Sequence, residues 1–284
     1  MATIGFALSQ TEMALKKADV PDSSVDARLL LSHVTGLSGM ELCLHSAQIL
    51  TEEQEQRLSA LLSCRVSRRP LQYLLKEQWF YGFPFYVDER VLIPRPETET
   101  LCELAITYLR QSPSPAVLDL CTGSGAIAVT LALECPNAHV TATDLSSDAL
   151  AVASLNSAQN HAAIQFFQGD LFAPLAGATY DCIVSNPPYI ETEACKTLQK
   201  EVQQEPLLAL DGGGDGLAYY RRIAKEAAGH LHAKGLLCLE IGDTQGEAVC
   251  ALLEKEGQYE NITLHNDLSG SPRVVCAYAL TSPT

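Results

Sequence analysis

The spacing of apolar positions divides the chain of 284 residues into parts of different character. In residues 1–70, apolar side chains recur at helical spacing, as at Leu58, Leu61 and Leu62, which predicts a unit built from helices. In residues 71–95, aromatic side chains crowd around Gly82, which predicts a short hairpin that links two domains.

Local patterns place several helix ends in the first part. Ser23 with Asp26 resembles a capping box, and Thr51 with Gln54 resembles another. Pro70 is expected to stop the helix that starts after Thr51. The basic side chains just before this proline are interpreted as a solvated helix end: Arg65, Arg68 and Arg69.

From residue 96 onward, short apolar runs alternate with helical patterns. The expected strands cover residues 116–120, 139–143, 164–167, 180–185, 236–241, 262–264 and 274–279. The expected helices begin at Pro96, Ala126 and Ser147 and near Tyr219 and Thr244. Such alternation predicts an α/β fold with a parallel, doubly wound sheet, whose ligands bind at the carboxyl ends of the strands.

Composition and charge narrow the possible partners. Hydrophobic residues make up 47% and charged residues 19% of the chain, so an ordered core is expected. The net charge of −15 lies almost entirely beyond residue 85, because residues 1–85 hold 8 Lys/Arg and 9 Asp/Glu. A basic stripe for nucleic acid is therefore not expected, whereas a basic protein partner would be attracted.

The cysteines and the chain start predict an intracellular protein. Ten cysteines are scattered without close pairs, so reduced thiols are expected and a metal site is not. No apolar run reaches eighteen residues, and the start resembles no targeting segment, which predicts a cytoplasmic protein with no membrane association.

A glycine-containing loop follows the first strand of the α/β part. The segment 122–125, Thr-Gly-Ser-Gly, lets a ligand approach the backbone, and Asp144 ends the next strand 19 residues beyond Gly125. A carboxylate at that place binds ribose hydroxyls in nucleotide-binding folds. The loop lacks a phosphate-binding lysine and the dinucleotide pattern, so an adenosine ligand without phosphates is favoured.

An Asn-Pro-Pro-Tyr turn, residues 186–189, leaves the expected strand 180–185. Each proline fixes its own φ and restrains the residue before it, so the turn is rigid. It presents the Asn186 amide and neighbouring carbonyls beside an aromatic face. Such a cradle fits a planar group with an NH2, either a side-chain amide or the amino group of a base.

Together these stretches resemble the peptide chain release factor glutamine N5-methyltransferases, the HemK family. The resemblance runs through residues 70–73, 91–99, 119–127, 185–190, 205–206, 210–216, 240–242 and 270–275. It implies a Rossmann-like, seven-stranded S-adenosylmethionine-dependent methyltransferase sheet in residues 96–284, with a small substrate-recognition domain in residues 1–70.

The resemblance also implies the site residues. S-adenosyl-L-methionine is expected to contact Cys121, Thr122, Gly123, Ser124, Gly125, Asp144, Asp170, Leu171 and Asn186. Catalytic roles are expected for Asn186, Pro187 and Tyr189, which form the substrate cradle together with Pro188.

Two residues depart from the family pattern. Cys121 replaces a glycine, so positive φ is not expected there. Leu171 replaces an aromatic residue that can stack on adenine, so weaker cofactor binding is expected.

The implied reaction is methyl transfer to the amide nitrogen of the glutamine in the Gly-Gly-Gln motif of class I release factors, by a monomer without direct nucleic-acid contact. The alternative enzyme is an N6-adenine methyltransferase acting on DNA or RNA, which would need a basic face and a base-flipping step. A third interpretation is a non-catalytic cofactor-binding protein, which the intact Asn-Pro-Pro-Tyr turn disfavours.

Overall fold

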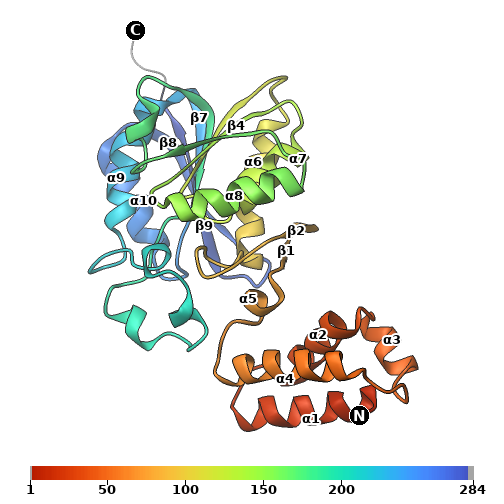
Figure 1. The fold of residues 1–284 in the computed structure, drawn as a ribbon. Coiled ribbons are helices and arrows are strands. Elements are labelled where there is room, and N and C mark those ends of the chain that lie inside the picture. The colour runs from red at the N-terminus through yellow and green to blue at the C-terminus, as the bar shows by residue number, and fades with distance from the viewer. Residues whose placement is uncertain (1, 281–284) are drawn as a thin grey trace. The chain divides into compact units, whose positions relative to one another are not determined.

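The computed structural model describes residues 2–280 and divides the chain into two compact units. The first contains Met1–Lys76 together with Gln199–Gln204, and the second contains Glu77–Leu198 together with Glu205–Thr284. Both are drawn in Figure 1. The chain therefore passes between the units after residues 76, 198 and 204. No helix within residues 2–280 combines the length and apolar composition needed to cross a membrane.

The first unit is helical, as its apolar spacing predicts. Its helices are α1 (Ile4–Lys17), α2 (Ser23–Thr35), α3 (Gly39–Leu44), α4 (Glu52–Val66) and α5 (Leu71–Leu75). Their apolar faces meet in one core that includes Leu15, Leu30 and Leu31. This core is separate from those of the second unit, so the helical unit has its own source of hydrophobic stabilisation.

Only one of the two expected capping boxes forms. Thr51 and Gln54 exchange side-chain and backbone hydrogen bonds at the start of α4, which confirms that prediction. The prediction for Ser23 is wrong, because α2 begins at Ser23 itself and Asp22 occupies the N-cap without a side-chain hydrogen bond. Asp26 instead accepts a hydrogen bond from Arg65 inside the unit.

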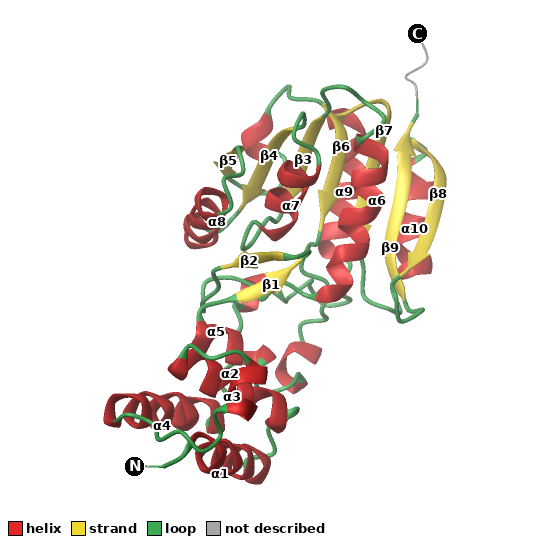
Figure 2. Ribbon diagram, turned by 90° about the vertical axis from the view of Figure 1, so that its right-hand side faces the viewer, coloured by secondary structure: helices red, strands yellow, loops and turns green. Residues whose placement is uncertain are grey.

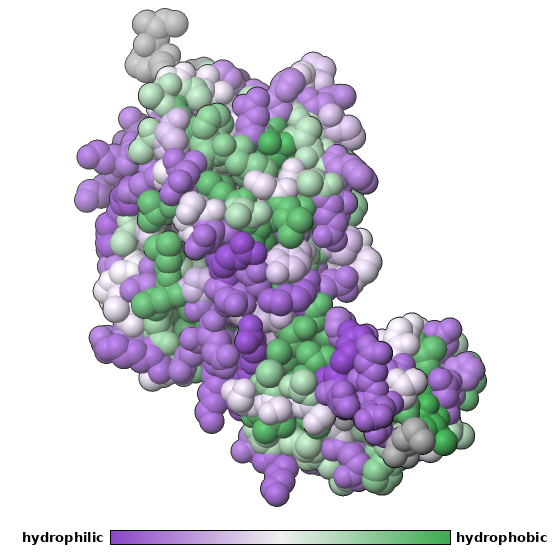
Figure 3. All heavy atoms as spheres, viewed as in Figure 1, coloured by the Kyte–Doolittle hydropathy of each residue, from purple (hydrophilic) through white to green (hydrophobic). Residues whose placement is uncertain are grey.

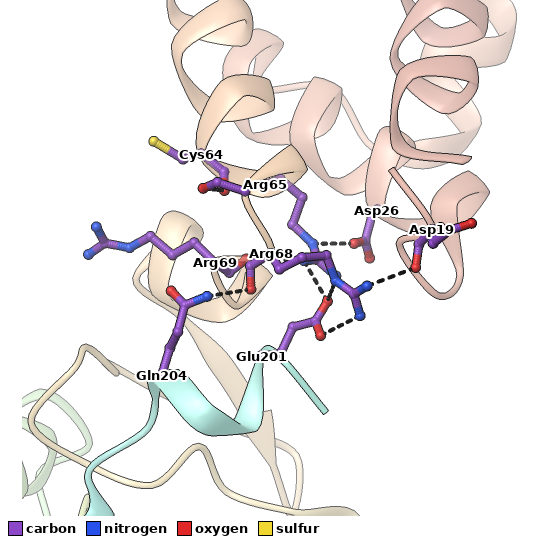
Figure 4. A network of polar contacts seen from close by, with 9 residues as sticks. Asp19, Asp26, Cys64, Arg65, Arg68, Arg69, Glu201 and Gln204 are labelled. Atoms are coloured by element: carbon purple, nitrogen blue, oxygen red, sulfur yellow. Dashed lines mark hydrogen bonds and ion pairs between the residues drawn. The ribbon is translucent and has the colours of Figure 1, made fainter. Parts of the chain in front are cut away.

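The basic end of α4 is not solvated, contrary to expectation. Arg65 is 5% exposed, and its Nε donates to Asp26 Oδ2 at 2.7 Å. Its Nη1 donates to Glu201 Oε1 at 2.9 Å, while Arg68 forms two hydrogen bonds to the same carboxylate, at 2.6 and 2.7 Å (Figure 4). Glu201 is remote in sequence but belongs to the helical unit. Its carboxylate supplies the negative charge beside the buried Arg65 and the half-buried Arg68.

The second unit is built on a seven-stranded sheet with the order β5-β4-β3-β6-β7-β9-β8 (Figure 2). The strands are β3 (Ala116–Leu120), β4 (His139–Asp144), β5 (Ile164–Gln168), β6 (Tyr180–Ser185), β7 (Leu231–Glu240), β8 (Tyr259–Asn266) and β9 (Pro272–Ala279). The expected seven strands are confirmed, but the sheet is mixed. β9 runs antiparallel to both β7 and β8, and a short turn joins β8 to β9.

Helices cover both faces of this sheet, as expected for a doubly wound fold. They are α6 (Glu99–Leu109), α7 (Ala126–Glu134), α8 (Ser147–Gln159), α9 (Ala218–Glu226) and α10 (Gly246–Glu256). Side chains of α6 and α7 share one apolar core, which also takes in the hairpin of β1 (Gln78–Phe80) and β2 (Phe83–Phe85). Side chains of α9 and α10 share the core on the other face.

The parallel register aligns the carboxyl ends of four strands. Leu120 at the end of β3 pairs with Thr143 of β4 and with Ser185 of β6, and Ser185 pairs in turn with Leu239 of β7. The residues that leave these strands therefore emerge at one edge of the sheet.

Glu201→Ala is expected to lower the free energy of unfolding of the helical unit by about 2–3 kcal/mol, because one buried and one half-buried guanidinium group lose charged hydrogen bonds. Burial opposes ionisation of Glu201, but hydrogen bonds from Arg68 and Arg65 outweigh it and lower its pKa to about 2. The stabilisation is therefore present above the ordinary pKa of 4.5 and is lost as the pH falls towards 2. Denaturant titration followed by circular dichroism measures the loss.

The matched control for this variant is Glu193→Ala. Glu193 pairs with Lys196 on the surface, where the two side chains are 81% and 67% exposed. A surface ion pair contributes about 0–1 kcal/mol, so the control should unfold almost as the wild type does. Equal destabilisation by the two variants would contradict the role assigned to Glu201.

Candidate functional site

The loop after β3 adopts a left-handed backbone at three of its five residues. Cys121, Gly123 and Gly125 have φ of 60°, 54° and 80°. The expectation that Cys121 avoids positive φ is therefore wrong. Thr122, which follows Cys121, is fixed by two hydrogen bonds. Its N–H donates to the Thr143 carbonyl, and its hydroxyl donates to Asp119. These contacts outweigh a strain of roughly 1–3 kcal/mol.

Asp144 is tied to the same loop by backbone hydrogen bonds. Its Oδ2 accepts from the Gly123 N–H at 2.8 Å, and its Oδ1 accepts from the Ser146 N–H at 2.9 Å. Burial raises the pKa of Asp144, and these two backbone hydrogen bonds oppose the shift. The carboxylate is therefore held in one orientation at the carboxyl end of β4, where ribose hydroxyls are bound in related folds.

A pocket opens at this edge of the sheet, within the second unit. It spans about 730 Å³ when the solvent space at its mouth is included, a size suited to a nucleoside-sized ligand. Of the residues expected at the site, it is lined by Cys121, Gly123, Asp144, Asp170, Leu171, Asn186 and Pro188. The structure therefore brings together the loop, the carboxylate and the Asn-Pro-Pro-Tyr turn.

The other expected residues do not line the pocket. Thr122 and Ser124 are buried, at 5% and 4% exposure, and support the loop from behind. Gly125 contacts Ala153 of α8, since a Cβ added at Gly125 would lie 3.0 Å from the Ala153 Cβ. Pro187 and Tyr189 also lie outside the lining, although their neighbours Asn186 and Pro188 belong to it.

Several lining residues were not foreseen. They are Arg90, Val91, Leu92, Thr143, Leu145, Ser146, Ala149, Gly169, Pro206, Leu208, Ala209 and Tyr219. Leu145 directly follows Asp144 and is 48% exposed, so its position after the strand-ending carboxylate was a usable signal. Thr143 and Ser146 flank Asp144 and Leu145, and Gly169 precedes Asp170, so they offered a similar signal. Most of the remaining lining residues come from segments that only the tertiary fold brings to the pocket.

Asp170 and Leu171 follow the end of β5 and have different surroundings. Asp170 forms an ion pair with Arg222 at 2.9 Å, and both side chains are about half exposed. Leu171 is 4% exposed, has φ of 50° and belongs to the core beneath α9. Leu171 thus contributes to the core as well as to the wall of the pocket.

The Asn-Pro-Pro-Tyr turn is anchored on both sides. Asn186 Nδ2 donates to Thr98 Oγ1 at 3.3 Å, and the Tyr189 carbonyl accepts from Gln245 Nε2 at 2.9 Å. Ile190 exchanges backbone hydrogen bonds with the segment 210–212. Burial, with an added contribution from Glu240, raises the pKa of Tyr189 to about 12, so its hydroxyl is protonated at neutral pH.

An ion pair between a buried carboxylate and a half-buried arginine links two walls of the pocket. Glu205 pairs with Arg95, and its Oε2 accepts from the Ile93 N–H at 3.0 Å. Burial raises the pKa of Glu205, and the Arg95 charge opposes the shift. Because Glu205 precedes Pro206 and Ile93 follows Leu92, these bonds join two segments that line the pocket.

The second unit has a fold that recurs in solved structures of methyltransferases, which are similar to this chain at low sequence identity. The hMettl16 catalytic domain, solved with a MAT2A 3′UTR hairpin, gives a TM-score of 0.57 at 18% identity and covers 72% of this chain and 78% of that chain. A methyltransferase from Pyrococcus furiosus gives 0.52 at 17% identity and covers 71% and 91%.

Sequence relatives identify the family. The family model described as "Methyltransferase small domain" matches residues 101–218, and that described as "PrmC N-terminal domain" matches residues 7–75. The release factor glutamine methyltransferase of Deinococcus radiodurans is 40% identical, over 95% of this chain and 96% of its own. That of Cereibacter sphaeroides is 43% identical, over 93% and 94%. The chain belongs to the release factor glutamine methyltransferase family.

Gly212→Ala is expected to destabilise the protein by about 1–3 kcal/mol, as overpacking does in dense surroundings. A Cβ at Gly212 would lie 2.7 Å from the Tyr189 Cα and 2.8 Å from the Pro188 carbonyl oxygen, so the Asn-Pro-Pro-Tyr turn would have to move. Gly214→Ala is the control in the same turn, because nothing lies within 4 Å of its added Cβ. The midpoints of thermal unfolding compare the two variants. Equal midpoints would contradict the close packing of Gly212 against the Asn-Pro-Pro-Tyr turn.

Proposed function

We propose that this protein transfers the methyl group of S-adenosyl-L-methionine to the side-chain amide nitrogen of the glutamine in the Gly-Gly-Gln motif of class I release factors. The observation that carries the proposal is the near full-length similarity to release factor glutamine methyltransferases, at 40–43% identity over 93–95% of the chain. The site supports it independently, because the Asn-Pro-Pro-Tyr turn borders the same pocket as Asp144.

The pocket residues fit the cofactor. Asp144 offers a carboxylate to ribose hydroxyls, and Gly123 leaves room for close approach to the backbone. Apolar side chains of Val91, Leu145 and Leu171 offer a surface for the adenine ring. A 16S rRNA methyltransferase of T. thermophilus, similar in fold with a TM-score of 0.51, was solved with AdoMet and guanosine. When bound, the cofactor supplies an electrophilic methyl group on a sulfonium.

The residues of the turn would act by positioning and polarisation. An amide nitrogen is a weak nucleophile because its lone pair is delocalised into the carbonyl. The Asn186 Oδ1 and the Pro187 carbonyl would accept the two amide hydrogens, which turns the lone pair towards the methyl group and draws charge onto the nitrogen. As the carbon–nitrogen bond forms, the bond between the methyl carbon and sulfur would break, the sulfur would leave with the electron pair as a neutral thioether, and the amide proton would pass to solvent.

Tyr189 would supply an aromatic face to the amide rather than a base. Its pKa of about 12 lies far above neutrality, so the ionised hydroxyl is scarce under physiological conditions. An aromatic face also attracts a cationic sulfonium.

The helical unit is proposed to recognise the protein substrate. It has its own core, yet it exposes large apolar side chains, among them Phe6, Met40, Leu44 and Ile49, at 55–76% exposure. Figure 3 shows apolar areas of this kind on the molecular surface. Exposed apolar areas rimmed by polar residues are typical of protein-binding surfaces.

The function is tested by incubating the protein with methyl-labelled S-adenosylmethionine and a full-length class I release factor, followed by mass mapping of the product. Label on the Gly-Gly-Gln glutamine is expected, with far weaker labelling of a short peptide that carries the motif alone. Label on nucleic acid instead would support the N6-adenine alternative. Binding of the cofactor with no transfer to any of these substrates would support a non-catalytic role.

Asn186→Ala is expected to lose most turnover while keeping the fold, because removal of one charge-stabilising acceptor lowers kcat by roughly 10²–10³-fold. Tyr189→Phe is its matched comparison and should retain most turnover, since the ring remains. Single-turnover kinetics with the release factor measure both. A Tyr189→Phe enzyme as inactive as Asn186→Ala would identify the hydroxyl as a base and exclude catalysis by positioning.

Asp144→Ala is expected to weaken cofactor binding by about 1.5–3 kcal/mol, the value of hydrogen bonds to a charged group. Calorimetry with S-adenosylmethionine measures the change. Asp148→Ala is the control, because Asp148 lies exposed on the first turn of α8 and outside the pocket lining. Unchanged affinity in Asp144→Ala would remove this carboxylate from the cofactor site.

A further inference from the structure

We infer that Thr98 and Glu240 form a hydrogen-bond relay that fixes the orientation of the Asn186 side-chain amide. Both are positioning residues, since neither lines the pocket. The inference rests on the proposed methylation of an amide, which gives Asn186 its acceptor role. It extends the proposed function by naming the residues that determine which end of the Asn186 amide faces the substrate.

The fold brings the three side chains together from distant parts of the chain. Asn186 and Glu240 stand side by side, because Ser185 of β6 pairs with Leu239 of β7. Thr98 ends the short turn Pro96–Thr98 before α6, and its Oγ1 accepts from Asn186 Nδ2 at 3.3 Å. Thr98 is 4% and Glu240 is 1% exposed, so water competes little for these bonds.

The hydroxyl of Thr98 has one hydrogen to donate. Since its oxygen already accepts from Asn186, this hydrogen is free for another acceptor. The Glu240 carboxyl supplies one, as hydrogen bonds from Thr98 and Asn186 lower the pKa of this group against the effect of burial. The donors therefore point from Asn186 towards Glu240, both directly and through Thr98.

This direction determines what Asn186 offers to a ligand. Nδ2 is held towards the interior, which leaves Oδ1 as the atom available to accept from the substrate amide. If the Asn186 side-chain amide were rotated by half a turn, its NH2 group would face the NH2 group of the substrate amide. Two hydrogen-bond donors in contact repel each other. A buried polar group without partners is rare, yet Glu240 Oε2 has none among the described residues. Retention of this costly carboxyl is consistent with a role beyond packing.

The ionisation of the Glu240 carboxyl is subject to opposing effects. Burial raises its pKa to about 7, against the hydrogen bonds from Thr98 and Asn186 and the positive charge of Arg273. The ionisable groups that interact electrostatically with it are Arg273 on β9, Glu97 before α6, Cys102 on α6, Tyr189 after β6 and Tyr220 on α9. Arg273 is the one cation in this set.

Turnover and stability should therefore respond oppositely to pH. The ionised carboxyl is the pure acceptor that the relay needs, so turnover should rise as the pH passes through about 7. The folded-state pKa is raised above its ordinary value of 4.5, so the contribution of Glu240 to stability is present below that value and is lost as the pH rises through 7. A merely structural carboxyl would produce only the second effect.

Three variants test the relay. Thr98→Val keeps the shape but removes the hydroxyl and should lower kcat at least tenfold, with the affinity for S-adenosylmethionine unchanged. Thr98→Ser restores the hydroxyl and should restore most of that loss. Glu240→Gln keeps the volume but cannot ionise and should lose the rise of kcat across neutral pH. Turnover is measured on the release factor, and circular dichroism checks the fold.

Tyr220→Phe is the structural control. The Tyr220 hydroxyl donates to the backbone carbonyl of Glu240 at 2.7 Å, so this variant disturbs the same residue without touching its carboxyl. It should lose stability and keep the pH profile. Wild-type kcat in Thr98→Val, or an unchanged pH profile in Glu240→Gln, would overturn the relay. Absence of turnover in the wild type would overturn the proposed function instead, so the two failures are distinguishable.

Discussion

The alignment of four strand ends at one edge of the sheet is the constraint on which the site depends. Leu120, Thr143, Ser185 and Leu239 share one register, so the residues just beyond them meet. A slip of one residue would turn every side chain of a strand to the opposite face and bury the wrong set. The packing that fixes this register, with helices on both faces, therefore also fixes the geometry of the chemistry.

The parts of this arrangement that depend on local pattern could be predicted from the sequence. A glycine loop, a carboxylate ending the next strand and a proline-rigidified turn are short signals, and the structure gathers Gly123, Asp144 and Asn186 at one pocket. The β7–β9 pairing could not be predicted, because a run of apolar residues carries no strand direction. The backbone of Cys121 could not either, since its strain is offset by contacts that Thr122 makes with other strands.

Contacts between remote residues set the behaviour of the buried charges. The basic end of α4 resembles a solvated helix end until Glu201, 136 residues beyond Arg65, supplies its counter-charge. Two guanidinium groups then keep Glu201 ionised, with a pKa of about 2. Among the described residues neither Asp119 nor Glu240 forms such a direct ion pair, and burial raises the pKa of each to about 7. Burial alone does not decide the charge of a carboxyl, because donors and positive charges around it act against the effect of burial.

The protonation states of the buried groups also determine how the protein could methylate an amide without a base. Two groups beside the Asn-Pro-Pro-Tyr turn are unsuited to act as the base in the pocket: the Tyr189 hydroxyl has a pKa of about 12, and the Glu240 carboxyl lies behind Asn186, outside the pocket lining. What the site can offer is a set of acceptors held in fixed directions, and a fixed direction requires that the opposite end of each group be engaged. For Asn186 the opposite end is Nδ2, bound to Thr98. The hydrogen bond behind the pocket thus determines which polar atom faces the pocket, because an Asn186 amide restrained at its nitrogen presents its oxygen.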